Sequence, residues 1–171
     1  MSVLLVDTSW LMYRSFYSFN LSSKRAGIDI PTGHLYGLIR AVKTLKYDKI
    51  VFVKDNYPKR RHELFPGYKD REGGNNQIYQ DFALVSSLFQ HLDWVTVLEV
   101  EDREADEVIG FLAHNTDGEV TVYSGDDDML QLLALRNVSV GKSVKNGKVV
   151  PLEQNYVEDK FGVNPSQLPL S

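Results

Sequence analysis

Cysteine is absent from the 171 residues of the chain. Without thiols the protein has no disulfide, no thiolate metal site and no cysteine nucleophile. The absence also fits a reducing compartment, where disulfides are rare.

Long apolar runs are missing as well. No stretch approaches the roughly 18 apolar residues that a membrane span requires. No basic region precedes the short apolar run at residues 3–6, as it would in a secretory signal. We therefore expect a cytoplasmic protein that is neither exported nor anchored.

The composition lies in the ordinary globular range, with 43% hydrophobic and 25% charged residues. The length is typical of one domain, and no repeat, linker or low-complexity tract interrupts it. We expect a single domain over residues 1–171.

The net charge of −4 hides an uneven distribution. Residues 1–71 contain 13 Lys and Arg against 6 Asp and Glu, whereas residues 72–171 contain 6 against 17. Such a split is a pointer to polyanion binding. The alternative is that these charges only solvate the surface.

Short apolar runs alternate with helical patterns along the chain. Uninterrupted apolar runs are typical of strands that are buried on both faces. Strands are expected at 3–6, 50–53, 95–100, 120–123 and 137–140. Apolar residues at helical spacing predict helices at 35–45 with Thr32 as N-cap, 78–92, 105–113 and 152–161. This alternation predicts an α/β fold with a mainly parallel central sheet and helices on both faces.

Two segments depart from the alternation. Residues 54–77 contain six basic residues, two prolines and almost no apolar periodicity, so we expect an extended or mobile excursion. Residues 141–149 resemble a hairpin, because Asn146-Gly147 is typical of a type I′ turn.

Acidic residues follow four of the predicted strands. They are Asp7, Asp55, the segment 101–107 and the segment 126–128. Ligands of an open parallel sheet bind beyond the carboxyl ends of its strands, where these side chains meet. Crowded carboxylates are costly unless cations neutralise them, and Mg²⁺ or Mn²⁺ prefer such oxygen ligands.

Each acidic residue also has a purely structural interpretation. Asp7 can cap the helix that follows it, and Glu104 and Glu107 can complement a helix N-terminus. One member of 126–128 can start a helix before residues 129–133. On the sheet-edge argument alone, both interpretations stay open.

Five ordered motifs resemble the 5′-nuclease family, which includes the 5′→3′ exonuclease domain of bacterial DNA polymerase I and phage flap endonucleases. The motifs are Asp7–Arg14, Thr32–Gly37, Arg61–Arg71, Glu104–Gly110 and Ser124–Asp128. The resemblance covers nearly the whole chain and implies a PIN-like fold with a basic, arch-like insertion at about 54–90.

The resemblance also implies a set of metal ligands and catalytic residues. The implied ligands of Mg²⁺ or Mn²⁺ in a two-metal site are Asp7, Asp55, Glu104, Asp106, Glu107, Asp126 and Asp128. Glu107 stands where the family usually has Asp. Asp55 matches the acidic residue that follows the second strand in the family, although Lys54 occupies the nominal position of that residue. Lys69 and Arg71 match basic residues that would contact the scissile phosphate.

Further residues match positions that contact nucleic acid in the family. They are Arg14, Thr32, Tyr36, Lys59, Arg60, Arg61 and Tyr68, with Tyr68 expected to stack on a terminal base. Tyr57, Phe65 and Tyr79 offer further aromatic faces for stacking. His62 is expected to be structural or near a phosphate.

The implied activity is metal-dependent hydrolysis of DNA at a 5′ end or flap, in a bacterial or phage-infected cell. The family continues beyond the last residues of this chain with a helical DNA-binding part. We therefore expect a shortened or split phage-type nuclease that needs a separate polypeptide for full activity. The alternatives are a nucleic-acid-binding protein with a vestigial metal site and a PIN-like ribonuclease.

Overall fold

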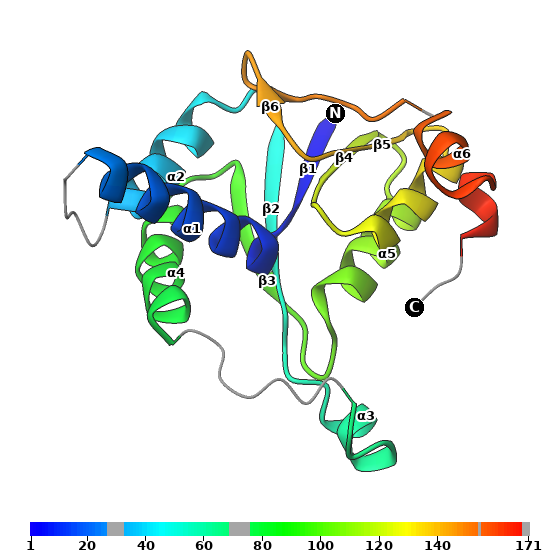
Figure 1. Ribbon diagram of the computed structural model, residues 1–171, viewed down its shortest axis with the longest axis horizontal. Coiled ribbons are helices and arrows are strands. Elements are labelled where there is room, and N and C mark those ends of the chain that lie inside the picture. Colours follow the sequence, from blue (N-terminus) through cyan, green and yellow to red (C-terminus); the bar gives the residue numbers. More distant parts are fainter. Residues whose placement is uncertain (27–32, 69–75, 154, 169–171) are drawn as a thin grey trace.

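The computed structural model describes residues 1–26, 33–68, 76–153 and 155–168. Its centre is a five-stranded sheet in the order β3-β2-β1-β4-β5, and every adjacent pair of strands is parallel (Figure 1). The strands are β1 (Ser2–Asp7), β2 (Lys49–Lys54), β3 (Val95–Glu99), β4 (Glu119–Tyr123) and β5 (Val138–Gly141). The predicted parallel sheet is confirmed, and each predicted strand is present.

The central strand β1 is apolar throughout because both of its faces are covered. Leu4 and Val6 enter one hydrophobic core, and Val3 and Leu5 enter the other. All four side chains are buried. A strand that buries alternate residues in two cores produces the uninterrupted apolar run seen in the sequence.

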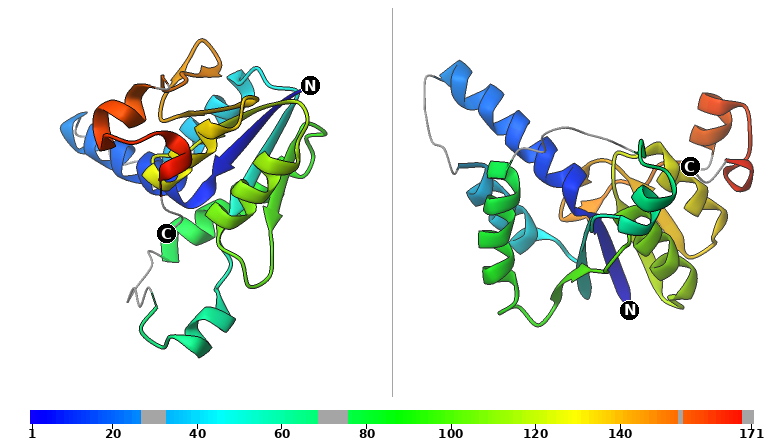
Figure 2. Two further views of the ribbon diagram at one scale, coloured as in Figure 1. Left: turned by 90° about the vertical axis from the view of Figure 1, so that its right-hand side faces the viewer. Right: turned by 90° about the horizontal axis from the view of Figure 1, so that it is seen from below.

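Helices cover both faces of the sheet, as predicted (Figures 1 and 2). One face carries α1 (Thr8–Ala26), α2 (Gly33–Thr44) and α4 (Asn76–Phe89). There Phe52 of β2 stacks on Phe89 of α4, with ring centroids 5.0 Å apart. The other face carries α5 (Ala105–Asn115) and the 3₁₀ helix η1 (Asp127–Ala134), whose apolar residues form the second core.

The segment after β2 differs from its prediction. The expected extended excursion is wrong for Lys59–Leu64, which form the short helix α3 below the sheet in Figure 1. None of the residues of α3 is buried, so this helix has no apolar stripe that the sequence pattern could reveal. Residues 69–75 lie outside the described part of the chain, and the predicted arch stays a prediction.

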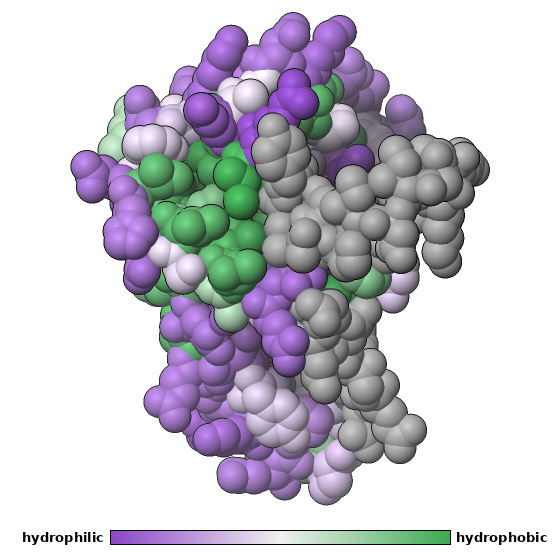
Figure 3. All heavy atoms as spheres, turned by 90° about the vertical axis from the view of Figure 1, so that its left-hand side faces the viewer, coloured by the Kyte–Doolittle hydropathy of each residue, from purple (hydrophilic) through white to green (hydrophobic). Residues whose placement is uncertain are grey.

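Apolar side chains are also exposed on one side of the molecule. Figure 3 shows the side that carries α1, α2 and α4, where apolar side chains gather above a mostly hydrophilic lower part. The exposed apolar side chains of α4 include Leu84 and Leu88.

The hairpin prediction is confirmed by β6 (Val144–Lys145) and β7 (Lys148–Val149), which pair antiparallel. Asn146 and Gly147 both have positive φ, 54° and 80°, as a type I′ turn requires. The chain continues into α6 (Asn155–Phe161) and the 3₁₀ helix η2 (Pro165–Gln167). In the described part of the chain, no helix has the length and apolar character needed to cross a membrane.

Candidate active site

The carboxyl ends of β1, β2 and β4 lie side by side because these strands are neighbours in the sheet. Asp7 ends β1, Asp55 follows β2 and Asp126 follows β4. All three line one open cavity of about 720 Å³. Its other lining residues are Ser9, Trp10, Tyr13, Asn56, Tyr57, Pro58, His62, Tyr79, Glu104, Ala105, Asp106 and Gly125.

Asp7 is fixed by hydrogen bonds to both of its carboxylate oxygens. The buried Ser124 hydroxyl donates to Oδ2 at 2.8 Å, and the Trp10 amide donates to Oδ1 at 3.3 Å. Burial raises the pKa of Asp7 above its ordinary value, and the two hydrogen bonds oppose that rise. The negative charges of Asp55 and Asp126 raise this pKa further, so the three carboxylates interact electrostatically.

Asp55 joins two elements of the site. Its Oδ2 accepts from the Ser9 hydroxyl at 2.6 Å, and its Oδ1 accepts from the Ala105 amide at the start of α5 at 2.8 Å. The preceding residue, Lys54, forms an ion pair with Glu99 at 3.1 Å instead. Asp55, and not Lys54, therefore supplies the charge that follows β2 at the cavity.

The turn after β4 is shaped by its small residues. The Asp126 amide donates to Ser124 Oγ at 3.1 Å, and the Asp126 carboxylate caps η1 by accepting from the Asp128 amide at 3.0 Å. A Cβ at position 125 would lie 2.1 Å from Trp10 Nε1, so only glycine fits there. The sequence prediction that one member of 126–128 starts a helix is confirmed for Asp126.

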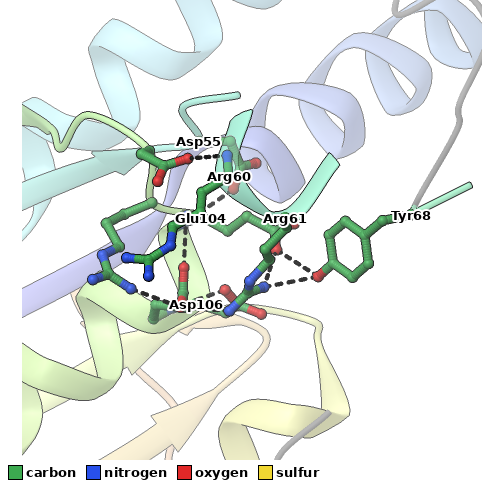
Figure 4. A network of polar contacts seen from close by, with 10 residues as sticks. Asp55, Arg60, Arg61, Tyr68, Glu104 and Asp106 are labelled. Carbon is green, nitrogen blue, oxygen red and sulfur yellow. Dashed lines mark hydrogen bonds and ion pairs between the residues drawn. The ribbon is translucent and has the colours of Figure 1, made fainter. Parts of the chain in front are cut away.

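Glu104 and Glu107 at the start of α5 are held by Arg61 of α3. Figure 4 shows Arg61 between Glu104 and Tyr68. The Arg61 guanidinium contacts Glu104 at 2.7 Å and Glu107 at 2.5 Å. The Tyr68 hydroxyl accepts from Arg61 at 2.8 Å and donates to Glu104 at 2.8 Å. Glu104 and Glu107 also form the capping box of α5, so the structural interpretation of these two residues is confirmed beside their position at the site.

The remaining acidic residues have different surroundings. Asp106 lines the cavity, and its Oδ1 accepts from the Glu107 amide at 2.7 Å. Asp128 contacts Asp126 through its amide but is not among the described residues that line the cavity. Asp127 forms ion pairs with Lys142 at 3.0 Å and Lys160 at 2.9 Å.

The carboxylates line one cavity, but their side chains are not arranged as a complete metal-coordination site. Among the residues that the structure describes, no three His, Asp or Glu side chains lie close enough together to hold an ion. Arg61 occupies two of the carboxylates, and Ser9 and Ala105 donate to Asp55. The donor chemistry nevertheless fits Mg²⁺ or Mn²⁺, since the set is all oxygen and a cation would relieve the repulsion felt by Asp7.

The predicted nucleic-acid contacts are distributed over several elements. Arg14 of α1 donates to the Lys142 carbonyl and lies 5.1 Å over the Trp10 ring. Lys59 and Arg60 are exposed on α3. The backbone of Tyr36 belongs to α2, but its side chain is outside the description, and Thr32, Lys69 and Arg71 lie outside the described residues.

Sequence reasoning assigned no role to Ser124, Trp10 or Tyr13, although all three contribute to the site. Trp10 fills the space above Gly125 and meets the Tyr123 ring edge-on, with centroids 5.1 Å apart. The signal in the sequence was their membership of the quoted motifs at 7–14 and 124–128.

Comparison with known proteins gives a consistent result. A family model described as the 5′-3′ exonuclease, N-terminal resolvase-like domain matches residues 2–162. The thermostable DNA polymerase I of Thermus filiformis is 37% identical over 176 residues, which cover 96% of this chain and 20% of the polymerase. The 5′-3′ exonuclease of Aquifex aeolicus is 30% identical over 174 residues, which cover 96% of this chain and 58% of that protein. The chain thus spans less than two thirds of either relative.

Two solved structures share the fold. The T5 D15 protein, co-crystallised with metal ions, aligns with a TM-score of 0.64 at 15% identity, covering 98% of this chain and 64% of that one. The catalytic core of Rad2, in complex with a DNA substrate, aligns with a TM-score of 0.51 at 14% identity, covering 95% of this chain and 49% of that one. At these identities the likeness shows a common fold.

Proposed function

Because the chain belongs to the family of 5′-3′ exonuclease N-terminal domains, we propose that it hydrolyses phosphodiester bonds of DNA with the help of divalent metal ions. The observation that carries this proposal is the single cavity lined by Asp7, Asp55, Glu104, Asp106 and Asp126. These residues come from three strand ends and one helix start, so only the folded chain brings them together.

The proposed metal holders are the cavity carboxylates, together with Glu107 and Asp128, which follow in sequence but are not among the lining residues. Bound Mg²⁺ or Mn²⁺ would supply a hydroxide nucleophile and stabilise the leaving oxygen. The chain's own residues prepare the site. Ser124 and the Trp10 amide orient the Asp7 carboxylate, and Asp55 fixes the start of α5 by accepting from Ala105.

The proposed substrate is DNA with a 5′ end or flap. Relatives are named as 5′-3′ exonucleases, and a structural neighbour was solved with a DNA substrate. Lys59 and Arg60 on α3, with Lys69 and Arg71 beyond it, would attract phosphates without reading sequence. A second polypeptide that completes the site, and a phage-type origin, stay predictions.

Asp126→Ala tests the proposal with a matched neighbour as control. The cleavage rate of a labelled flap DNA is measured in the presence of Mg²⁺ or Mn²⁺. We expect Asp126→Ala to lower this rate at least about a hundredfold, because a metal ligand is removed, and to change DNA binding little. Asp127→Asn should keep cleavage because Asp127 faces Lys142 and Lys160 instead of the cavity.

The cleavage assay is run with the chain alone and again after adding a polypeptide that corresponds to the part of the exonuclease relatives that this chain does not cover. Equal cleavage by Asp126→Ala and the unsubstituted chain would contradict the metal assignment. Preferential cleavage of single-stranded RNA would favour the ribonuclease alternative.

Binding without hydrolysis is the second candidate function. The ion pairs of Arg61 with Glu104 and Glu107 favour it, because they leave two proposed metal ligands neutralised by the protein itself. Tight flap binding with no cleavage under any of these conditions would select this candidate.

A further inference from the structure

The acidic cavity is also lined by aromatic rings, two of which form a stacked pair. The rings of Tyr57 and His62 have centroids 4.4 Å apart and planes inclined by only 13°. Both residues line the cavity, and Tyr57 is 60% exposed. A ring that lies flat on a second ring and still exposes most of its surface is able to stack on a planar ligand.

The backbone around Tyr57 is held from both sides. On the N-terminal side, the Asn56 side chain donates to Glu99 at 2.9 Å and accepts from the Asp102 amide at 2.8 Å. On the C-terminal side, the Lys59 amide donates to the Tyr57 carbonyl at 2.9 Å, and Pro58 restricts its own φ. Tyr57 is therefore positioned before any ligand arrives, which lowers the entropy lost on binding.

The stacked pair is connected to the carboxylates through a third ring. His62 meets Tyr68 edge-on, with centroids 5.9 Å apart and planes at 80°. The Tyr68 hydroxyl in turn donates to Glu104 at 2.8 Å. The row of rings thus ends at one of the proposed metal ligands, so the distance from Tyr57 to the reacting phosphate is set by the fold.

We propose that Tyr57, supported by His62, is a positioning residue that stacks on the base of an unpaired nucleotide next to the scissile phosphate. This inference rests on the proposed DNA substrate. Every base presents a π face, so such a platform accepts any sequence. A base that is paired and stacked within a duplex is not available to it, so Tyr57 favours single-stranded ends over blunt duplexes.

The test measures binding to a fluorescent duplex with a 5′ single-stranded end, by anisotropy without divalent metal so that no cleavage occurs. A second series of substrates carries an abasic site at each of the first three unpaired positions in turn. We expect Tyr57→Ala to weaken binding of the intact end about tenfold, within the range for loss of one stacked base. The loss should disappear for one of the abasic substrates, because the base that stacks is missing there.

Two variants separate stacking from general damage. Tyr57→Phe keeps the ring and should bind like the unsubstituted chain. Phe111→Ala removes an aromatic ring that is 65% exposed on α5 but does not line the cavity, and it should leave binding unchanged.

A Tyr57→Ala loss that is equal on the intact and on every abasic substrate would overturn the platform, and so would no loss at all. The cleavage assay with Asp126→Ala is independent of this measurement. Cleavage without a base-dependent effect of Tyr57 rejects the platform alone, whereas a base-dependent effect without any cleavage rejects the hydrolysis alone.

Discussion

Two aspartates near the same sheet edge have opposite electrostatic surroundings. Burial raises the pKa of Asp7, and the charges of Asp55 and Asp126 add to the rise against the hydrogen bonds from Ser124 and Trp10. The hydrogen bonds and charges of Lys160 and Lys142 lower the pKa of Asp127. A cation bound beside Asp7 would relieve its repulsion by Asp55 and Asp126, whereas the charge of Asp127 is already neutralised by two lysines.

The two shifts predict opposite pH dependences of stability. The folded chain holds the Asp7 proton more tightly than the unfolded chain, so ionisation of Asp7 costs stability as the pH rises above about 4. Without metal, Asp7→Asn should therefore raise the melting temperature at neutral pH, and the gain should shrink towards pH 4. The gain in melting temperature is measured by thermal denaturation, followed by circular dichroism, at several pH values between 4 and 7.

Asp127→Asn is the matched control with the reverse sign. The Asp127 carboxylate stabilises the folded chain at every pH above the ordinary Asp pKa. This stabilisation is lost as the pH falls through the lowered pKa that Asp127 has in the folded chain. This variant should melt earlier than the unsubstituted chain at neutral pH and approach it in acid. The same direction of change in both variants would contradict the assigned surroundings.

At the residue scale, the sequence predicted that acidic residues follow the strands at one sheet edge, and five of the seven predicted carboxylates line the cavity there, but it did not predict what each one contacts. Strand ends are readable where a short apolar or β-branched run gives way to polar residues, so Asp7 and Asp126 could be placed at the sheet edge. Whether Lys54 or Asp55 faces the cavity depends on the neighbouring strand, where Glu99 pairs with Lys54. The pairing of Arg61 with Glu104 joins residues 43 positions apart and leaves no local pattern.

At the element scale, burial decides what can be predicted. Helices α2, α4 and α5 each bury an apolar side, and their spacing was visible in the sequence. Helix α3 buries none of its residues, and its sequence predicts an extended segment. Among its contacts, Arg61 binds α5, the Arg60 amide donates to Asp102 at 3.0 Å, and the His62 ring stacks on Tyr57.

Arg61 therefore couples helix α3 to the acidic residues of α5. Arg61→Gln removes the positive charge that neutralises Glu104 and Glu107, so we expect Mn²⁺ to bind several-fold more tightly. Helix α3 should exchange its amide hydrogens faster, while global stability falls by about 1 kcal/mol or less, as for other solvent-accessible ion pairs. Isothermal titration calorimetry and hydrogen exchange measure the two effects.

Arg60→Gln controls for the loss of one positive charge from the same helix. Arg60 is exposed and holds Asp102 through its backbone, which the substitution keeps. Equal Mn²⁺ affinities in the Arg60 and Arg61 variants would show that the ion pairs of Arg61 do not compete with metal.

At the scale of the whole molecule, the site exists because parallel strands place their carboxyl ends on one edge. Asp7 and Asp126 are separated by more than a hundred positions, yet β1 and β4 are neighbours. The strand order could not be read from the sequence, because apolar runs identify strands without identifying their partners. The consequence is a fold in which Asp7, Asp55 and Asp126 repel one another at one edge of the sheet, which is a cost to stability that a bound cation removes.

That cost predicts a metal-dependent gain in stability. A ligand at one hundred times its dissociation constant stabilises a folded protein by about 2.7 kcal/mol, which corresponds to roughly 5–10 °C for a domain of this size. We expect Mn²⁺ to raise the melting temperature of the unsubstituted chain by about this amount and EDTA to reverse it. Asp7→Asn and Asp126→Ala should lose the gain, whereas Asp127→Asn should keep it, because its carboxylate already faces two lysines. An unchanged Mn²⁺ effect in Asp7→Asn would mean that the ion binds elsewhere on the protein.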